Sequence, residues 1–488
     1  MLFNSYEFIF VFLPIVFICY FCFLNRRWIV GAKVFLVIAS LCFYAYWNVI
    51  YLPLILFSLF CNYVIGMNLS RSYGFLSRKS VLIFGVVFNL ILLGYFKYMD
   101  FFIDNFNGIF GSHIPLHHVV LPLGISFFTF TQIAFLVDAY RSEAREYSIV
   151  NYMLFVTYFP HLLAGPILHH KEMMPQFSNL KNYAKNYKNI AMGCFIFSLG
   201  LFKKVVIADG FALWANAGFD GGNNLNLAEA WITSLSYTFE LYFDFSGYTD
   251  MAIGLSLLFN IKLPVNFNSP YKAKDIQDFW RRWHMTLSRF LRDYLYIPLG
   301  GSRKGELRTY INLMITFILG GLWHGAGWTF VLWGFLHGLA LVIHRVWKKL
   351  GLRMHSLLAW FLTFNFINIT WIFFRAKDMQ DAWRVLSSMF SLDRVVLPSF
   401  LETKMEFLHT FGISFGFFVA NIGGDYFTPL WILCAFVLVL YFKNSMKISC
   451  GGGGHNLSYL KATFSYALFF ISLYFMLDAK TEFLYFNF

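Results

Sequence analysis

The sequence predicts an all-α protein that crosses a membrane many times. Of its 488 residues, 59% are hydrophobic and 13% are charged, whereas soluble domains carry about 25% charged residues. The mean hydropathy is +0.60, and apolar runs close to the length that crosses a hydrocarbon core recur along the chain. Because a bundle of many spans shares one core, we expect a single membrane domain over residues 1–488.

The apolar runs predict about eleven crossings with one or two re-entrant pieces. Arg26-Arg27, Arg71 and Arg78-Lys79 mark alternate ends as cytoplasmic, which places the start of the chain outside. The first run is long enough to span, so we expect an anchor there and not a removable signal peptide. The expected spans are 6–24, 29–47, 50–68, 80–98, 190–212, 356–374, 405–421, 428–442 and 459–477, and the broken or longer apolar stretches 119–139, 228–261 and 310–345 supply the rest.

Helix breakers interrupt two apolar runs. Pro122 and Gly124 lie inside 119–139, and Gly165-Pro166 lies inside 150–168. A broken helix at membrane depth must be sheltered by protein or line a cavity. We therefore expect a re-entrant segment near Gly165.

The run 228–261 contains Glu240, Asp244, Ser246 and Asp250. Ionisable groups at membrane depth are costly and usually face a protein interior or a watery path. The alternative is that residues 245–250 form a loop between two helices and the acids are simply solvated.

The charge balance favours a lipid surface over nucleic acid as the partner. The chain holds 38 basic and 25 acidic residues, a net charge of +13. In a membrane protein this indicates positive-inside topology and contact with anionic headgroups. Ten Lys or Arg residues against four acids lie in 262–308. We expect 265–308 to be a cytoplasmic interfacial segment.

Residues 276–295 have the pattern of one amphipathic helix lying in the membrane interface. Apolar side chains recur at steps of three and four, and Arg281, Arg282, Arg289 and Arg292 fall largely on the other side. The helix could only anchor on lipid, or its Arg face could steer a phosphate-bearing donor. His284 points toward the buried face.

A second histidine lies deep in apolar sequence, in GGLWHGAGW around His324. An imidazole facing a wet tunnel can remove a proton from a hydroxyl; the alternative is a structural hydrogen bond between helices. His337 and His344 could share its face, but no third ligand has zinc spacing, so we expect no metal site. The tandem pairs His117-His118 and His169-His170 are read as polar loop residues.

Taken together, the motifs resemble the membrane-bound O-acyltransferase family, in its bacterial branch of alginate and peptidoglycan O-acetylation and teichoic-acid D-alanylation. The resemblance covers nearly the full chain. The motifs that carry it are MLFNSYEFIFVFLP, LPLGISFFTFTQIAFLVDAYR, YFPHLLAGPI, YFDFSGYTDMAIGLSLLFNIKLPVNFNSPY, DFWRRWHMTLSRFLRDYLYIPLGGSRKG, LGGLWHGAGWTFVLWGFLHG and WIFFRA.

The resemblance implies a ring of helices around a central tunnel and an acyl thioester donor on the cytoplasmic side. His324 would be the catalytic base and His284 would line the cytoplasmic mouth. No bound cofactor is implied, because the donor, expected to be acetyl-CoA, is a substrate. The positions assigned to the donor side or to matching motifs are Arg281, Arg282, Trp283, Arg289, Asp244, Tyr248, Asn266 and Asn268.

The last residues, 478–488, resemble the family's aromatic tail with a central tyrosine. Tyr485 is therefore a candidate acyl relay, the alternative being an aromatic anchor after the final span. The resemblance implies a bacterial inner-membrane enzyme that exports acetyl groups to an extracytoplasmic O-acetyltransferase partner, which modifies a polysaccharide. The rival function is a transporter or flippase of an acylated carrier without acyl-transfer chemistry.

Overall fold

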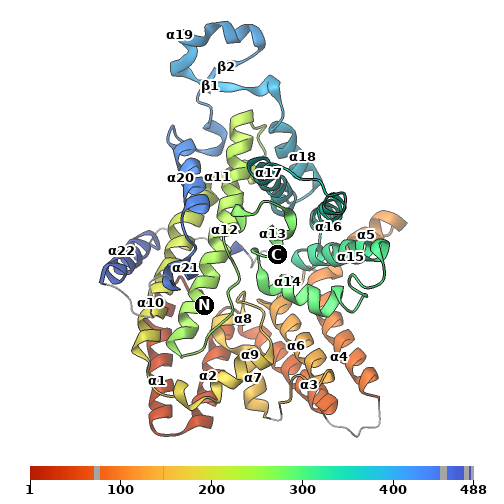
Figure 1. Ribbon diagram of the computed structural model, residues 1–488, viewed down its shortest axis with the longest axis vertical. Coiled ribbons are helices and arrows are strands. Elements are labelled where there is room, and N and C mark those ends of the chain that lie inside the picture. Colours follow the sequence, from red (N-terminus) through yellow and green to blue (C-terminus); the bar gives the residue numbers. More distant parts are fainter. Residues whose placement is uncertain (71–76, 147, 451–458, 478–482, 485–488) are drawn as a thin grey trace. The chain divides into compact units, whose positions relative to one another are not determined.

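The computed structural model describes residues 1–70, 77–146, 148–450, 459–477 and 483–484 (Figure 1). These residues form two compact units. The first contains Met1–Phe202, Gly247–Asn266 and the described residues from Ser445 onward; the second contains Lys203–Ser246 and Phe267–Asn444. Helix α12, Leu227–Leu258, runs from the second unit into the first.

All the regular elements in the described part of the first unit are helices. Helices α1 and α2 pack against each other, α6 packs against α3 and α4, and α10 packs against α22. Its elements are η1 (Glu7–Phe12), α1 (Leu13–Asn25), α2 (Ile29–Ala45), η2 (Val49–Tyr51), α3 (Leu52–Ser70), α4 (Arg78–Leu93), η3 (Gly94–Tyr98), α5 (Met99–Phe110), α6 (Ile125–Tyr140), α7 (Ile149–Thr157), α8 (Phe159–Leu162), α9 (His170–Phe177), η4 (Leu180–Asn182), α10 (Tyr187–Phe202), α21 (Ser445–Cys450) and α22 (Tyr459–Phe475).

A buried amide cluster ties three of these helices together. Asn62 of α3 donates to Gln132 of α6, and the amide of Asn89 of α4 donates to the side-chain oxygen of Asn62 at 2.6 Å. Ser58 donates to the same Gln132 oxygen at 3.1 Å. Hydrogen bonds between polar side chains hold helices together where lipid gives no hydrophobic driving force.

The second unit contains the closely paired helices α15 and α16. Its elements are η5 (Lys203–Ala208), α11 (Asp209–Asp220), the first part of α12, η6 (Pro270–Lys272), α13 (Ile276–Trp280), α14 (Met285–Leu291), η7 (Arg292–Tyr296), α15 (Glu306–His324), α16 (Trp328–Lys349), α17 (Ser356–Arg375), α18 (Met379–Ser388), η8 (Leu392–Arg394), β1 (Val396–Pro398), η9 (Ser399–Leu401), α19 (Glu402–Met405), η10 (Glu406–Phe411), β2 (Ser414–Gly416), η11 (Ala420–Ile422) and α20 (Thr428–Tyr441).

Six helical stretches among the described residues are long and apolar enough to span a membrane, and four apolar helices are shorter. The chain is therefore a multi-pass membrane protein, whereas the count of about eleven spans stays a prediction. The long stretches are Glu7–Asn25, Val49–Ser70, Arg78–Phe110, Tyr187–Asp220, Trp328–Lys349 and Ser356–Arg375; the shorter helices are α2, α6, α20 and α22.

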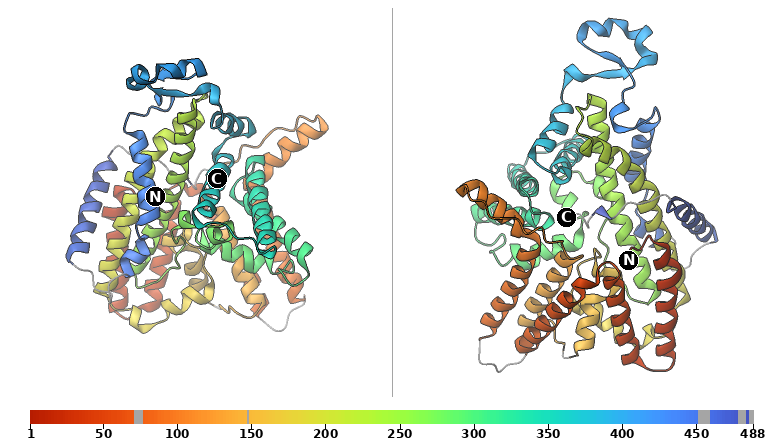
Figure 2. Two further views of the ribbon diagram at one scale, coloured as in Figure 1. Left: turned by 45° about the horizontal axis from the view of Figure 1, so that its top comes forward. Right: turned by 180° about the vertical axis from the view of Figure 1, so that it is seen from behind.

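The expected span at 405–421 is wrong. Strands β1 and β2 pair in parallel, with Val396 opposite Ser414, and short helical turns join them. Gly412 has φ +78°, which ends a helix. This segment extends beyond the ends of α11 and α12 in Figure 1 and in the right view of Figure 2. We call residues 389–427 the cap.

The expected helix breaks are confirmed. Gly124 has φ +69° and caps α6, and a Cβ there would lie 3.2 Å from the carbonyl oxygen of Leu162. The helical stretch after Tyr158 ends at Leu162, and the chain then runs without regular structure to His169. Glycine is required where the backbone is left-handed and closely covered.

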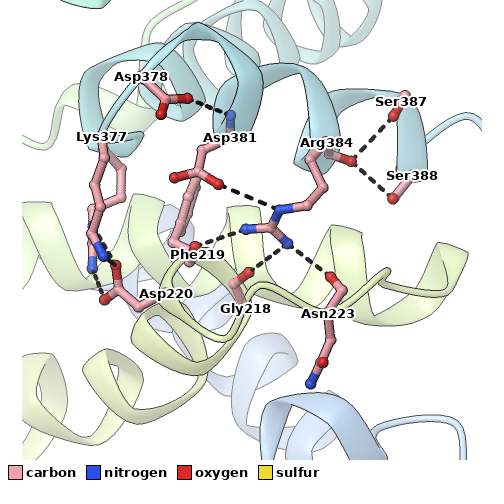
Figure 3. Close-up of polar contacts among 11 residues, drawn as sticks. Gly218, Phe219, Asp220, Asn223, Lys377, Asp378, Asp381, Arg384, Ser387 and Ser388 are labelled. Atoms are coloured by element: carbon pink, nitrogen blue, oxygen red, sulfur yellow. Dashed lines mark hydrogen bonds and ion pairs between the residues drawn. The ribbon is translucent and has the colours of Figure 1, made fainter.

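Arginine anchors α17 and α18 to α11 (Figure 3). Arg384 donates to the carbonyl oxygens of Gly218, Phe219 and Asn223 at 2.7–3.2 Å. Arg375, from the WIFFRA motif, pairs with Asp220 at 2.6 Å. The hydrogen bonds from Arg384 satisfy backbone carbonyl groups at the end of α11, and the ion pair of Arg375 neutralises a carboxylate there. Arg375 of the WIFFRA motif therefore has a structural role.

Helices α15 and α16 meet through glycines. A Cβ on Gly334 would collide with the carbonyl oxygen of Phe317 and lie 3.1 Å from the Cα of Ile318. A Cβ on Gly321 would collide with the carbonyl oxygen of Phe330 and lie 3.0 Å from the Cα of Gly334. Small residues allow two helix backbones to approach this closely in a membrane.

We expect Gly334→Ala to destabilise the protein by about 1–3 kcal/mol, because the new methyl group meets backbone that cannot rotate away. The measurement is the apparent Tm of purified protein in detergent. Gly210→Ala, on α11 where nothing lies within 4 Å, is the matched control and should leave the Tm unchanged or higher. Equal Tm values for both variants would contradict the close contact.

Candidate active site

The basic segment 276–296 is not one helix, which corrects the sequence prediction. It consists of α13, a turn, α14 and η7. The break falls at His284, whose φ of +42° is left-handed and opens α14. A non-glycine residue in this region is uncommon and is held by its surroundings. The expected division into a buried apolar face and an Arg face nevertheless holds, since Phe279, Trp283 and Leu287 are buried.

His284 is fully buried, as the sequence predicts. Its ring meets Phe245 edge-on, with centroids 4.8 Å apart, and lies 6.4 Å from the ring of Trp323. Burial lowers the pKa of His284 to about 3, because the charged form would lose its hydration. The imidazole is therefore neutral at physiological pH.

His324 ends α15, where Gly325 turns the chain into an extended conformation. Its side chain is 4% exposed. The rings of Trp323, Trp333 and Phe374 surround it at centroid distances of 4.9, 5.3 and 5.1 Å. Trp323 also contacts His284, so one indole touches both histidines. The structure thus brings together the two histidines predicted from separate motifs.

A basic cavity of about 910 Å³ lies between α13, α14, η7, α15 and α16. Trp280, Leu291, Thr316 and Phe317 form part of its wall. Phe317 precedes His324 by seven residues, about 10 Å along α15. The basic side chains that line the cavity are Arg281, Arg289, Arg292, Arg345, Lys348 and Lys349, and Glu306 is the acidic one among its lining residues.

Two of these cations are neutralised by carboxylates. Arg292 pairs with Asp293 at 2.7 Å and Arg345 with Glu306 at 3.2 Å. The hydrogen bond from Arg345 lowers the pKa of Glu306. Among the described residues, six basic side chains line the cavity against the single carboxylate of Glu306, and this balance suits an anion that carries several phosphates.

The sequence named only part of this cavity. Arg281 and Arg289, which were predicted on the donor side, line it, and their role in donor binding stays a prediction. Arg345, Lys348 and Lys349 were missed, because they end a separate apolar helix and no motif includes them. A cluster of basic residues at the end of an apolar run, Lys348-Lys349, was the one signal available.

Arg282, Trp283 and Asn268 were predicted near the donor but do not line the cavity. Arg282 pairs with Asp278 at 2.9 Å and contacts the carbonyl oxygen of Asn268 at 3.4 Å. The side-chain oxygen of Asn268 accepts from Asn444 at 3.0 Å. Trp283 stacks on Phe279, with centroids 5.7 Å apart. These contacts fix the turn around His284; their part in donor binding stays a prediction.

Asp244 is buried in an ion network and does not line the cavity. The Nζ atom of Lys204 lies 2.7 Å from a carboxylate oxygen of Asp244 and 2.7 Å from one of Asp209. The alternative of a solvated loop at residues 245–250 is wrong, because α12 is continuous there and Asp250 is 6% exposed. Breaking one partner of a buried pair leaves an uncompensated charge, so this network stabilises the second unit only when complete.

Tyr248 and Asn266 belong to the first unit and are buried there. The Tyr248 ring stacks between Phe3 and Phe483, at centroid distances of 4.8 and 4.4 Å. The stack joins the two ends of the described chain. Tyr485, the candidate relay, lies outside the described residues.

The tandem histidines differ from each other. The backbone N–H groups of His117 and His118 donate to Asp100 in an exposed loop, as expected. His170, by contrast, is buried at the start of α9 beside Glu146. His169 contacts Asp138 at 3.2 Å. His169 is a polar loop residue as predicted, whereas His170 is a buried helix residue, and each contacts a different carboxylate.

Comparison with known proteins shows which family the chain matches. The family described as MBOAT, membrane-bound O-acyltransferase, matches residues 9–377. A peptidoglycan O-acetyltransferase of Helicobacter pylori is 47% identical over 100% of this chain and 98% of its own length. A probable alginate O-acetylase of Pseudomonas aeruginosa is 43% identical over 80% of this chain and 75% of its own. A teichoic acid D-alanyltransferase of Streptococcus thermophilus is 28% identical over 54% of this chain and 69% of its own.

The buried His284 makes stability depend on pH. Its pKa is about 3 in the folded protein and about 6.5 when unfolded. The unfolded chain therefore binds the extra proton between these values, and stability falls as pH drops from 6.5 toward 3, by up to about 1.4 kcal/mol per pH unit. We expect His284→Asn, which tolerates the left-handed backbone and does not titrate, to lose less stability between pH 6.5 and 4.

The measurement is thermal unfolding in detergent across this pH range for both proteins. The difference between the two slopes isolates His284, since all other titrating groups are shared. Parallel slopes would show that His284 has the same pKa in the folded and the unfolded protein, which would contradict the burial effect.

Proposed function

The chain belongs to the membrane-bound O-acyltransferase family, and from this premise we propose that it takes an acetyl group from a cytoplasmic thioester and delivers it for O-acetylation of a polysaccharide outside the cell. Relatives named for peptidoglycan and alginate O-acetylation support that acceptor class. The observation that carries the proposal is that one helix, α15, both lines the basic cavity and ends at His324.

The donor is proposed to be acetyl-CoA bound in the basic cavity. A CoA thioester carries a diphosphate and a further phosphate on its ribose. Arg281, Arg289, Lys348 and Lys349 would contact these phosphates with charge-assisted hydrogen bonds. The apolar wall at Trp280 and Phe317 would receive the chain that leads to the thioester, in the direction of His324.

The chemistry is proposed for His324. Its neutral imidazole takes the proton of an acceptor hydroxyl, whose oxygen attacks the thioester carbonyl. The carbon–sulfur bond then breaks, and the imidazolium returns the proton to the departing thiolate. The aromatic surroundings exclude water, which would otherwise hydrolyse the thioester. His284 would act on His324 indirectly, through the indole ring of Trp323 that contacts both imidazoles.

The two sides of the membrane follow from α17. Its 20 residues cover about 30 Å, the thickness of a hydrocarbon core. Arg345, Lys348, Lys349 and Arg353 precede it, and the cap follows it. The positive-inside preference then assigns the cavity to the cytoplasm and the cap to the outside of a bacterial inner membrane. An extracytoplasmic partner that passes the acetyl group to the polymer completes the proposal.

We expect His324→Ala to abolish acetyl transfer, with a loss of at least about 100-fold, because the hydroxyl would keep its proton. The measurement is ester-linked acetate on purified wall or exported polysaccharide from cells that carry each variant. Membrane insertion and monodispersity in detergent are the controls. A variant that inserts normally and still supports full acetylation would favour a transporter that performs no acyl transfer.

We expect Arg281→Ala and Arg289→Ala each to raise KM for acetyl-CoA about tenfold, since each removes a contact to a phosphate. Arg303→Ala, in the same basic segment but away from the cavity, is the matched control. S-acetyl-pantetheine, which lacks the phosphates, should show no difference among these proteins. Equal KM values for acetyl-CoA across all variants would place the donor elsewhere.

A further inference from the structure

His337 lies on α16 between the basic cavity and His324, and no step proposed above uses it. It is fully buried. Its Nδ1 atom accepts a hydrogen bond from the indole N–H of Trp280 at 3.2 Å. Its Nε2 atom lies 3.1 Å from Oγ1 of Thr370, whose hydroxyl donates to the carbonyl oxygen of Ile367 at 2.9 Å.

These contacts assign one protonation state to His337. An indole nitrogen only donates, so Nδ1 must accept and carries no proton. The Thr370 hydroxyl proton is already engaged, so its oxygen accepts and Nε2 carries the proton. His337 is thus a neutral imidazole with both nitrogens occupied, which suits a fixed support and excludes a proton carrier in this arrangement.

Two indole rings that contact His337 connect the cavity wall with His324. Trp280 is part of the cavity wall. Trp333 lies 4.6 Å from His337, 5.8 Å from Trp280 and 5.3 Å from His324, all between ring centroids. Contacts therefore run without a gap from the cavity wall through Trp280 and Trp333 to His324.

We propose that His337 is a positioning residue for acyl transfer: it sets the Trp280 wall of the donor cavity through one hydrogen bond, is itself held by Thr370 through the other, and packs its ring against Trp333 beside His324. The inference rests on the proposed role of His324. Without the acceptor at Nδ1, the indole N–H of Trp280 would be buried and unsatisfied, and the ring would turn to find a partner. Both donor binding and the orientation of His324 would change together.

The test uses the full-length protein in inside-out membrane vesicles, with radiolabelled acetyl-CoA as the probe and base-labile acetate on the wall polysaccharide as the product. We expect His337→Phe to lower kcat about tenfold or more and to raise KM for acetyl-CoA several-fold, per folded molecule. Trp280→Phe, which keeps a ring but lacks the N–H, should raise KM in the same way. Folded protein is quantified by size exclusion in detergent.

Two substitutions of Thr370 distinguish a positioning role of His337 from an effect on protein stability alone. Thr370→Val keeps the shape and removes the acceptor, and we expect the same split of kcat and KM as in His337→Phe. Thr370→Ser restores the hydroxyl and should restore both constants. A purely structural role would lower only the amount of folded protein, and unchanged kcat and KM per folded molecule in His337→Phe and Thr370→Val would overturn the proposal.

His324→Ala is measured in the same vesicles to keep the two claims apart. Loss of transfer in His324→Ala together with wild-type constants in His337→Phe would reject the positioning role and leave the proposed function standing. Full transfer by His324→Ala would reject the proposed base, whatever the His337 variants do.

Discussion

The second unit depends on the close approach of α15 and α16. Gly321 and Gly334 allow the two backbones to touch, and this contact places Trp333 of one helix beside His324 of the other. It also fixes Phe317 against Trp280, with ring centroids 5.0 Å apart. A larger side chain at either glycine would separate the candidate base from the cavity wall. The glycines that let α15 and α16 pack closely therefore also determine the arrangement of the candidate site.

Aromatic density around the histidines has a chemical consequence. Rings enclose His284, His324 and His337 closely, and burial keeps the imidazole of His284 neutral. The same burial that disfavours a charged imidazolium at His284 also keeps water away from these rings. The 63 phenylalanines thus include neighbours of the candidate site histidines, such as Phe245 and Phe374, as well as helix contacts.

Charge is used in two different ways. Arg375 and Arg384 bind carboxylate and carbonyl groups and hold helix ends together. Arg281 and Arg289, by contrast, face a cavity in which basic groups outnumber acids. Residues of one type, all in or near recognisable motifs, therefore divide into structural anchors and candidate ligand contacts. Only their neighbours in space distinguish the two.

The sequence by itself determined the helical membrane class, the breaks at Gly124 and near Gly165, and the burial of His284 and His324, because hydropathy and glycine or proline act locally. Tertiary structure decided the rest. The left-handed backbone at His284 divides what the sequence presents as one amphipathic helix. Residues 405–421 form short turns and a paired strand instead of a span. Asp244 forms an ion pair with Lys204. Lys348 and Lys349 line the same cavity as Arg281 because α16 packs beside α13. Contacts between residues that are far apart in the sequence produce no periodic sequence pattern, so the sequence alone does not predict them.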